Sequence, residues 1–114
     1  MRLTSDFFVS ALTRRVFANG DFAAVEKKGH DSAGAIFIRQ RLRMGLVNLY
    51  GPAPQHLSAD GFERTERRFE LRLAAVEQEE ADRLIEREMR FDSDLWLIEL
   101  EVESVEGLFE VVSA

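Results

Sequence analysis

Apolar residues recur at helical spacing in two segments of the chain, residues 5–20 and residues 77–90. The positions concerned are Phe8, Val9, Leu12 and Val16 in the first segment and Ala81, Leu84, Ile85 and Met89 in the second. A period near 3.6 residues predicts an amphipathic helix in each segment. Ser5 or Asp6 can cap the first helix, and Gly20 can end it because glycine adopts a positive φ at little cost.

Between and after the helices, polar and apolar residues alternate with the period of two that indicates β-strands. The predicted strands lie at residues 22–29, 35–43, 46–50, 67–75 and within 91–103. Residues 29–34 have the composition of a hairpin loop, and residues 51–61, which hold both prolines, that of a surface loop. The order α-β-β-β-β-α-β predicts an α+β domain, with a mainly antiparallel sheet of about five strands and two helices packed on one face.

Two of these strands carry a row of charge on one face. The first row is Arg39, Arg41 and Arg43, and the second is Glu99, Glu101 and Glu103, on the face opposite Trp96, Ile98, Leu100 and Val102. Because the rows have equal spacing and opposite sign, we expect them to lie against each other, in the sheet or across a dimer interface. Each cross-strand pair would then contribute about 0.2–1 kcal/mol. If the strands are not neighbours, each row is a solvated face.

The composition is that of a folded globular chain. The 114 residues are 46% hydrophobic and suit one domain, for which we take residues 1–103, followed by a C-terminal tail, residues 104–114, that adds a short strand or frays. Cysteine is absent, which excludes disulfides, thiolate metal ligands and cysteine nucleophiles. No window approaches the ~20 apolar residues of a membrane span, so we expect a cytoplasmic protein without a membrane partner.

The net charge of −6 is divided unevenly along the chain. Residues 1–50 hold eight Lys or Arg against four Asp or Glu, whereas residues 51–114 hold seven against seventeen. An acidic chain argues against a dedicated nucleic-acid-binding protein. The basic half nevertheless leaves a second function open, in which the face of Arg39, Arg41 and Arg43 binds the phosphates of an anion or a nucleic acid.

The acidic stretch 91–103 departs from a calcium-binding loop. Asp92, Asp94 and Glu103 fall at the first, third and twelfth positions of an EF-hand register, but Leu97 stands where that loop requires glycine. We therefore interpret Asp92 and Asp94 as turn residues, with a loose divalent site as the weaker alternative. No metal site is predicted.

The two histidines give only weak catalytic patterns. Residues 30–32 are His, Asp and Ser, but a hydrolase triad needs convergence in space rather than adjacency in a loop. His56 lies in the proline loop, where Asp60 or Glu63 is a candidate partner, and this arrangement is the enzyme alternative. The glycines have neither dinucleotide-binding nor P-loop spacing, so no cofactor is predicted.

Several blocks of the sequence, taken together, resemble a known family. They are LTSDFFVSALTRRVFANGDFAAVEKKG, followed in order by AGAIFI, LYGPAP, RRFE and RFDSDLW. Over residues 1–103 the chain is similar to an uncharacterised bacterial family, the domain of unknown function 1491, found mostly in alphaproteobacteria. The resemblance implies a small single-domain cytoplasmic protein and assigns neither an activity nor a catalytic residue.

These observations favour a non-catalytic protein that associates with itself or with another protein. Sheet edges in so small a domain need covering, and a homodimer covers them. The candidate binding residues are Arg39, Arg41, Arg43, Glu99, Glu101 and Glu103.

Overall fold

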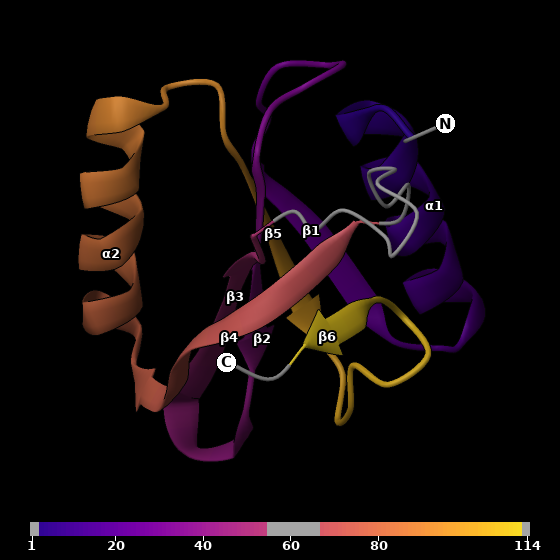
Figure 1. The fold of residues 1–114 in the computed structure, drawn as a ribbon. Coiled ribbons are helices and arrows are strands. Elements are labelled where there is room, and N and C mark those ends of the chain that lie inside the picture. Colours follow the sequence, from indigo (N-terminus) through magenta and orange to yellow (C-terminus); the bar gives the residue numbers. More distant parts are fainter. Residues whose placement is uncertain (1–2, 55–66, 113–114) are drawn as a thin grey trace.

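In the part of the chain that the structure describes, the fold has two helices and six strands, shown as a ribbon in Figure 1. The structure, a computed structural model, describes residues 3–54 and 67–112. Its elements are α1 (Ser5–Ala18), β1 (Phe22–Lys27), β2 (Ile36–Arg41), the short 3₁₀ turn η1 (Arg43–Gly45), β3 (Leu46–Pro52), β4 (Arg68–Glu77), α2 (Gln78–Phe91), β5 (Trp96–Glu101) and β6 (Glu110–Val112). The predicted α+β class is confirmed. Within the described residues, no helix is long and apolar enough to cross a membrane.

The six strands form one sheet in the order β1-β5-β2-β3-β4-β6. β5 pairs antiparallel with β1 and parallel with β2, and β6 pairs parallel with β4. The sheet is therefore mixed and six-stranded, and the expectation of a mainly antiparallel sheet of about five strands is wrong. The interpretation of residues 29–34 as a hairpin loop is also wrong, because β5 inserts between the two strands that this loop connects.

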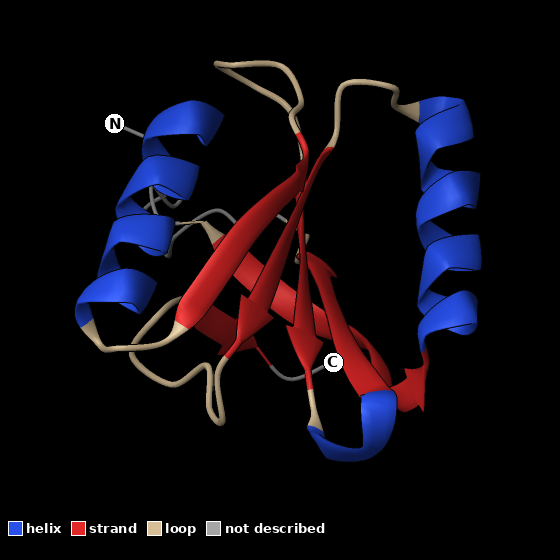
Figure 2. Ribbon diagram, turned by 180° about the vertical axis from the view of Figure 1, so that it is seen from behind, coloured by secondary structure: helices blue, strands red, loops and turns tan. Residues whose placement is uncertain are grey.

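The two helices lie on opposite faces of the sheet, which stands between them in Figure 2. One buried cluster joins α1 residues Val9, Leu12 and Val16 to Trp96, Ile98 and Leu100, and the other joins α2 residues Ala81 and Ile85 to Val47, Leu95 and Leu97. The expectation that both helices pack on one face is therefore wrong. The physical reason is that β5 presents apolar side chains on both faces, and burying each one fully stabilises the fold by about 1.5–3 kcal/mol.

The start of α1 is tied to the loop before β2. Thr4 caps the helix, in place of the predicted Ser5 or Asp6, and its hydroxyl oxygen accepts a hydrogen bond from a first-turn N–H at 3.4 Å. Ser5 is instead fully buried, and its hydroxyl donates to the carbonyl oxygen of Gly34 at 2.6 Å. This contact holds α1 against the loop that crosses β5.

The C-terminal segment lies against the sheet. Leu108 is buried, and Phe109 packs edge-to-face on Phe69 with ring centroids 5.0 Å apart. The guanidinium of Arg15, in α1, donates to the carbonyl oxygens of Gly107 and Leu108 at 3.1 and 3.3 Å. These contacts place β6 beside β4 and help to cover the α1 side of the core.

Candidate functional site

The two rows of charge predicted from the sequence lie side by side in the sheet. β2 and β5 run parallel, in a register that places Arg39 beside Glu99 and Ile38 beside Ile98. The prediction that the Arg row lies against the Glu row is confirmed, and the pairing occurs within one chain. The rows differ in exposure along their length. The inner members, Arg39 and Glu99, are buried, and the other members, which we call the outer residues, are exposed.

Arg39 is the centre of a buried ion-pair cluster, which involves carboxylates from β1, β5 and α2. Its side chain is only 5% exposed. Its Nε lies 2.8 Å from Oε1 of Glu99, its Nη2 lies 2.7 Å from Oε1 of Glu26, and its Nη1 lies 3.4 Å from Oδ1 of Asp82. Glu99 is 10% exposed, whereas Glu26 and Asp82 are nearly half exposed. The interpretation of Arg39 and Glu99 as outer residues is wrong, and open surface remains only at the other members of the rows.

Beyond this pair, a surface hollow of about 560 Å³ lies at the carboxyl ends of β2 and β5. It is lined by Asp21, Arg41, Leu42, Arg43, Glu101, Val102 and Glu103, and we call it the corner hollow. Its ion pairs are long: Arg41 Nη1 lies 3.7 Å from Oε2 of Glu99, and Arg43 Nη2 lies 3.6 Å from Oε1 of Glu103. The side chains of Arg43 and Glu103 are 92% and 93% exposed. An exposed pair such as that of Arg43 with Glu103 contributes about 0–1 kcal/mol, so a partner's charges can replace it at small cost.

Two exposed aromatic residues adjoin the corner hollow. Phe22 follows Asp21 in the chain and lies opposite Glu101 in the β1–β5 register. Its ring packs edge-to-face against that of Phe17, with centroids 5.8 Å apart, and about half of each side chain is exposed. Apolar aromatic surface beside charged residues is the usual composition of the core and rim of a protein interface.

A buried polar network supports the wall of the corner hollow. The side-chain amide of Gln40 donates to the carbonyl oxygens of Val102 and Glu103 at 3.1 and 3.3 Å. Its Oε1 accepts a hydrogen bond from the Tyr50 hydroxyl at 3.3 Å. Burial raises the pKa of Tyr50 above its ordinary value, and a hydrogen bond with Asn48 partly offsets the shift. The network fixes the chain that leaves β5, which in turn positions Glu103.

The corner hollow is suited to recognition through charge. Its lining holds three carboxylates and two guanidinium groups, with Leu42 and Val102 as apolar members. Each arginine of the row faces a carboxylate, which weakens the phosphate-binding alternative. Within residues 3–54 and 67–112, no group of three or more His, Cys, Asp or Glu side chains is arranged to hold a metal ion.

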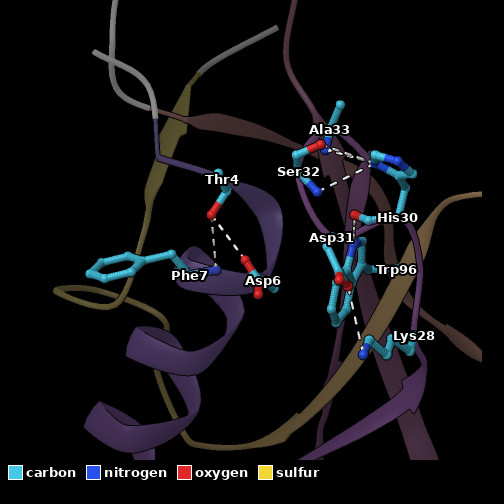
Figure 3. Close-up of polar contacts among 9 residues, drawn as sticks. All are labelled: Thr4, Asp6, Phe7, Lys28, His30, Asp31, Ser32, Ala33 and Trp96. Carbon is cyan, nitrogen blue, oxygen red and sulfur yellow. Dashed lines mark hydrogen bonds and ion pairs between the residues drawn. The ribbon is translucent and has the colours of Figure 1, made fainter.

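The His-Asp-Ser run at residues 30–32 is a local turn, shown in Figure 3. His30 Nδ1 accepts hydrogen bonds from the main-chain N–H groups of Ser32 and Ala33, each at 3.3 Å. The carboxylate of Asp31 lies 3.6 Å from Lys28 Nζ, so its ion-pair partner is the lysine. The indole N–H of Trp96 donates to the carbonyl oxygen of His30 at 2.9 Å. The Ser32 hydroxyl also lies 3.3 Å from His30 Nδ1, but the carboxylate of Asp31 pairs with Lys28 and not with the imidazole. These contacts hold the loop over β5 and do not link the three side chains as a Ser-His-Asp relay.

The remaining candidate residues from the sequence are the acidic pair of the proposed turn and the three residues of the enzyme alternative. The N–H of Asp94 donates to Oδ1 of Asp92 at 3.0 Å, which confirms the turn interpretation of these residues. His56, Asp60 and Glu63, the residues of the enzyme alternative, lie outside the described residues.

Sequence reasoning missed three acidic residues that complete these clusters, namely Asp21, Glu26 and Asp82. They belong to other elements, and only the strand order brings them to the rows. A signal for the buried position of Arg39 was present, since its strand begins with three consecutive apolar residues, Ile36 to Ile38. Such a run is typical of a strand that is covered on both faces.

The comparisons with known proteins agree with this fold. A family described as a protein of unknown function (DUF1491) matches residues 3–110. The chain belongs to this family. A solution structure of protein Atu0922 from A. tumefaciens is 61% identical, with a TM-score of 0.87, and the match covers 100% of this chain and 98% of that one. The DUF1491 description assigns no activity.

Two structures of a DUF1491 family protein from Caulobacter crescentus CB15 are more distant. The crystal structure is 30% identical with a TM-score of 0.76, covering 99% of this chain and 100% of that one. The NMR structure is 30% identical with a TM-score of 0.74, covering 99% of each chain. No curated protein matches the sequence.

Proposed function

We propose that this DUF1491 protein is a non-catalytic association module that binds itself or another protein through the corner hollow. The observation that carries the proposal is the open end of the charge rows, where Arg41, Arg43, Glu101 and Glu103 line one hollow beside the exposed ring of Phe22. The cytoplasmic location expected from the sequence stays a prediction.

Two physical features support binding at this place. The ion pair between Arg43 and Glu103 is long and more than nine-tenths exposed, so it costs little to exchange for a partner's charges. The half-exposed rings of Phe17 and Phe22 supply apolar area, which is worth about 25 cal/mol per Å² when it is buried. Charge would then select the partner, and the rings would supply much of the affinity.

The phosphate alternative has weaker support. The guanidinium of Arg39 is buried among three carboxylates, and Arg43 lies beside Glu103. An anion at this face would meet carboxylates at similar range, which opposes its binding.

Charge reversal in the corner hollow tests the proposed function. We expect the variant Glu101→Lys/Glu103→Lys to lose a partner that the wild-type protein retains in a pull-down from native lysate, or to lose self-association in light scattering. The matched control is Glu79→Lys/Glu86→Lys, which makes the same charge change on exposed positions of α2. If wild type captures nothing and stays monomeric, or if both double variants behave alike, the proposed function is wrong.

A further inference from the structure

β1 is the longer of the two edges of the sheet. In the strand order it has β5 on one side and no strand on the other, whereas the opposite edge is β6, which has only three residues. Within the described residues, the main chain of Phe22–Lys27 pairs with β5 alone. Outward N–H and C=O groups of β1 are therefore a template for another strand.

The usual protection of an edge strand is weak in β1. Proteins often guard such edges with charged side chains, but both charges of β1 point elsewhere. Glu26 turns to Arg39, and Lys27 Nζ donates to the carbonyl oxygens of Ser93 and Leu95 at 2.8 and 2.9 Å. A register shift between Val25 and Lys27 disturbs the end of the strand. The regular part, residues 22–25, is Phe-Ala-Ala-Val and carries no charge.

We infer that a second copy of this chain covers β1, by antiparallel pairing of the two β1 strands about a two-fold axis at Ala24. The inference rests on the proposed function and names the partner. Residues on the same side of a strand meet across such an axis, so Phe22 lies opposite Glu26 of the second copy and Ala24 lies opposite itself. The six strands of each copy then form one continuous sheet.

Charge complementarity supports a second copy as the occupant. Antiparallel pairing brings the start of β1, where Asp21, Glu101 and Glu103 line the corner hollow, to the end of β1 in the other copy. The lysine available there is Lys28, because Lys27 is held by the carbonyl oxygens of Ser93 and Leu95. Lys28 is well exposed, and its ion pair with Asp31 is long, at 3.6 Å, so its charge can turn to the hollow. The two-fold axis repeats this contact on both sides of the interface.

Apolar side chains add to the same contact. Phe22 is 48% exposed and Val25 is 45% exposed, and both lie in the segment that pairs. An interface built on one short strand and its flanking side chains is at the small end of specific interfaces. We therefore expect a reversible dimer whose population depends on concentration in the micromolar range.

Light scattering across micromolar to near-millimolar concentrations tests the dimer. The mass should rise from 13.0 kDa toward twice that value for the wild-type protein. Val25→Lys places a new charge on each side of the two-fold axis and should keep the protein monomeric. Phe91→Lys is the control, because it makes the same charge change at an apolar residue that is 88% exposed and far from β1 in sequence. A monomer at every concentration, or equal effects of both variants, would overturn the inference.

A disulfide tests the register directly, because the natural chain has no cysteine. Opposed residues in antiparallel strands have Cα atoms about 4.5–5.5 Å apart, which a disulfide can bridge. Ala24→Cys should therefore form a covalent dimer rapidly under mild oxidation, and Ala74→Cys, an exposed alanine in β4, should not. Equal, slow oxidation of both variants overturns the pairing of β1 with itself.

These outcomes separate the inference from the proposed function. A protein that stays monomeric, yet captures a partner that Glu101→Lys/Glu103→Lys loses, keeps its association function and excludes the second copy as its target. Loss of both behaviours removes the two proposals together.

Discussion

Replacement of Arg39 by methionine should remove a large part of the stability of this protein, because it leaves the buried Glu99 with only its long ion pair to Arg41, at 3.7 Å. Removing one member of a buried pair typically costs about 3–5 kcal/mol, and Glu99 is only 10% exposed. Glu26 and Asp82 are nearly half exposed, so water can solvate them once the guanidinium is gone. We therefore expect Arg39→Met to lose about 3–5 kcal/mol, compared with a total of about 5–15 kcal/mol for proteins in general.

Urea unfolding, followed by fluorescence of the buried Trp96, measures this loss. With a slope of about 1–3 kcal/mol per molar urea, the midpoint should fall by roughly 2 M. Arg43→Met is the matched control, since its ion pair is more than nine-tenths exposed and its loss should change the midpoint little.

A double variant separates the ion pair from simple loss of packing. Arg39→Met/Glu99→Leu should recover most of the stability, because replacing both members of a buried pair by apolar residues is often neutral or stabilising. The reasoning is refuted if Arg39→Met unfolds at the same urea concentration as Arg43→Met, or if the double variant is no more stable than Arg39→Met alone.

Three further predictions concern other parts of the fold. Because burial raises the folded pKa of Tyr50 above 10.0, the stability linked to its neutral phenol is fully present below that pH and should be lost as pH rises through the folded pKa. Absorbance of the phenolate and unfolding at alkaline pH measure this loss of stability. Tyr50→Phe should abolish the dependence of stability on pH that is linked to the phenol. Gly29→Ala places a Cβ against the carbonyl oxygen of Asp94 and should cost about 1–3 kcal/mol in thermal or urea unfolding; an unchanged midpoint contradicts the close approach. Gln40→Met leaves the carbonyl oxygen of Val102 without its donor and should cost a similar ~1–3 kcal/mol, whereas no loss would mean that the buried amide does not stabilise the fold.

Local periodicity predicted most of the elements of this fold. The second helix was evident because Ala81, Leu84, Ile85 and Met89 lie on one stripe, and in the structure Ala81 and Ile85 are buried. The two charge rows were equally visible, since a period of two places their members on one face of a strand. Such patterns involve residues that are close in sequence, so they can be recognised from the sequence alone.

Strand order could not be derived in the same way. The insertion of β5 between β1 and β2 pairs segments about sixty residues apart, as the register of Arg39 with Glu99 illustrates. One clue was present in residues 95–100, where apolar side chains occupy both faces of the strand. That pattern is typical of a central strand with a helix on each side. Recognising it would have placed the helices on opposite faces and indicated that Glu99 is buried.

The spacing of the charge rows leaves the register of β2 and β5 ambiguous. A slip of two residues keeps every apolar side chain on its own face, and in one direction it still pairs Arg39 with Glu101. The slipped arrangement, however, would bury Glu99 away from Arg39, at a cost of several kcal/mol. The buried pair therefore selects one register, which the rows alone do not.

The buried pair of Arg39 and Glu99 stabilises the fold, whereas the outer residues of the rows contribute little to it, and this contrast explains why binding is assigned to the outer residues. Glu26 and Asp82 meet Arg39 from β1 and α2, so the inner cluster, which also includes Glu99, holds four elements of the fold together. A partner that engaged Arg39 would have to break those contacts and would cost the protein its stability. Arg43 and Glu103 contribute little to the fold, because their pair is long and exposed. Substitution there can change a binding surface without unfolding the protein, which is the property that an association site requires.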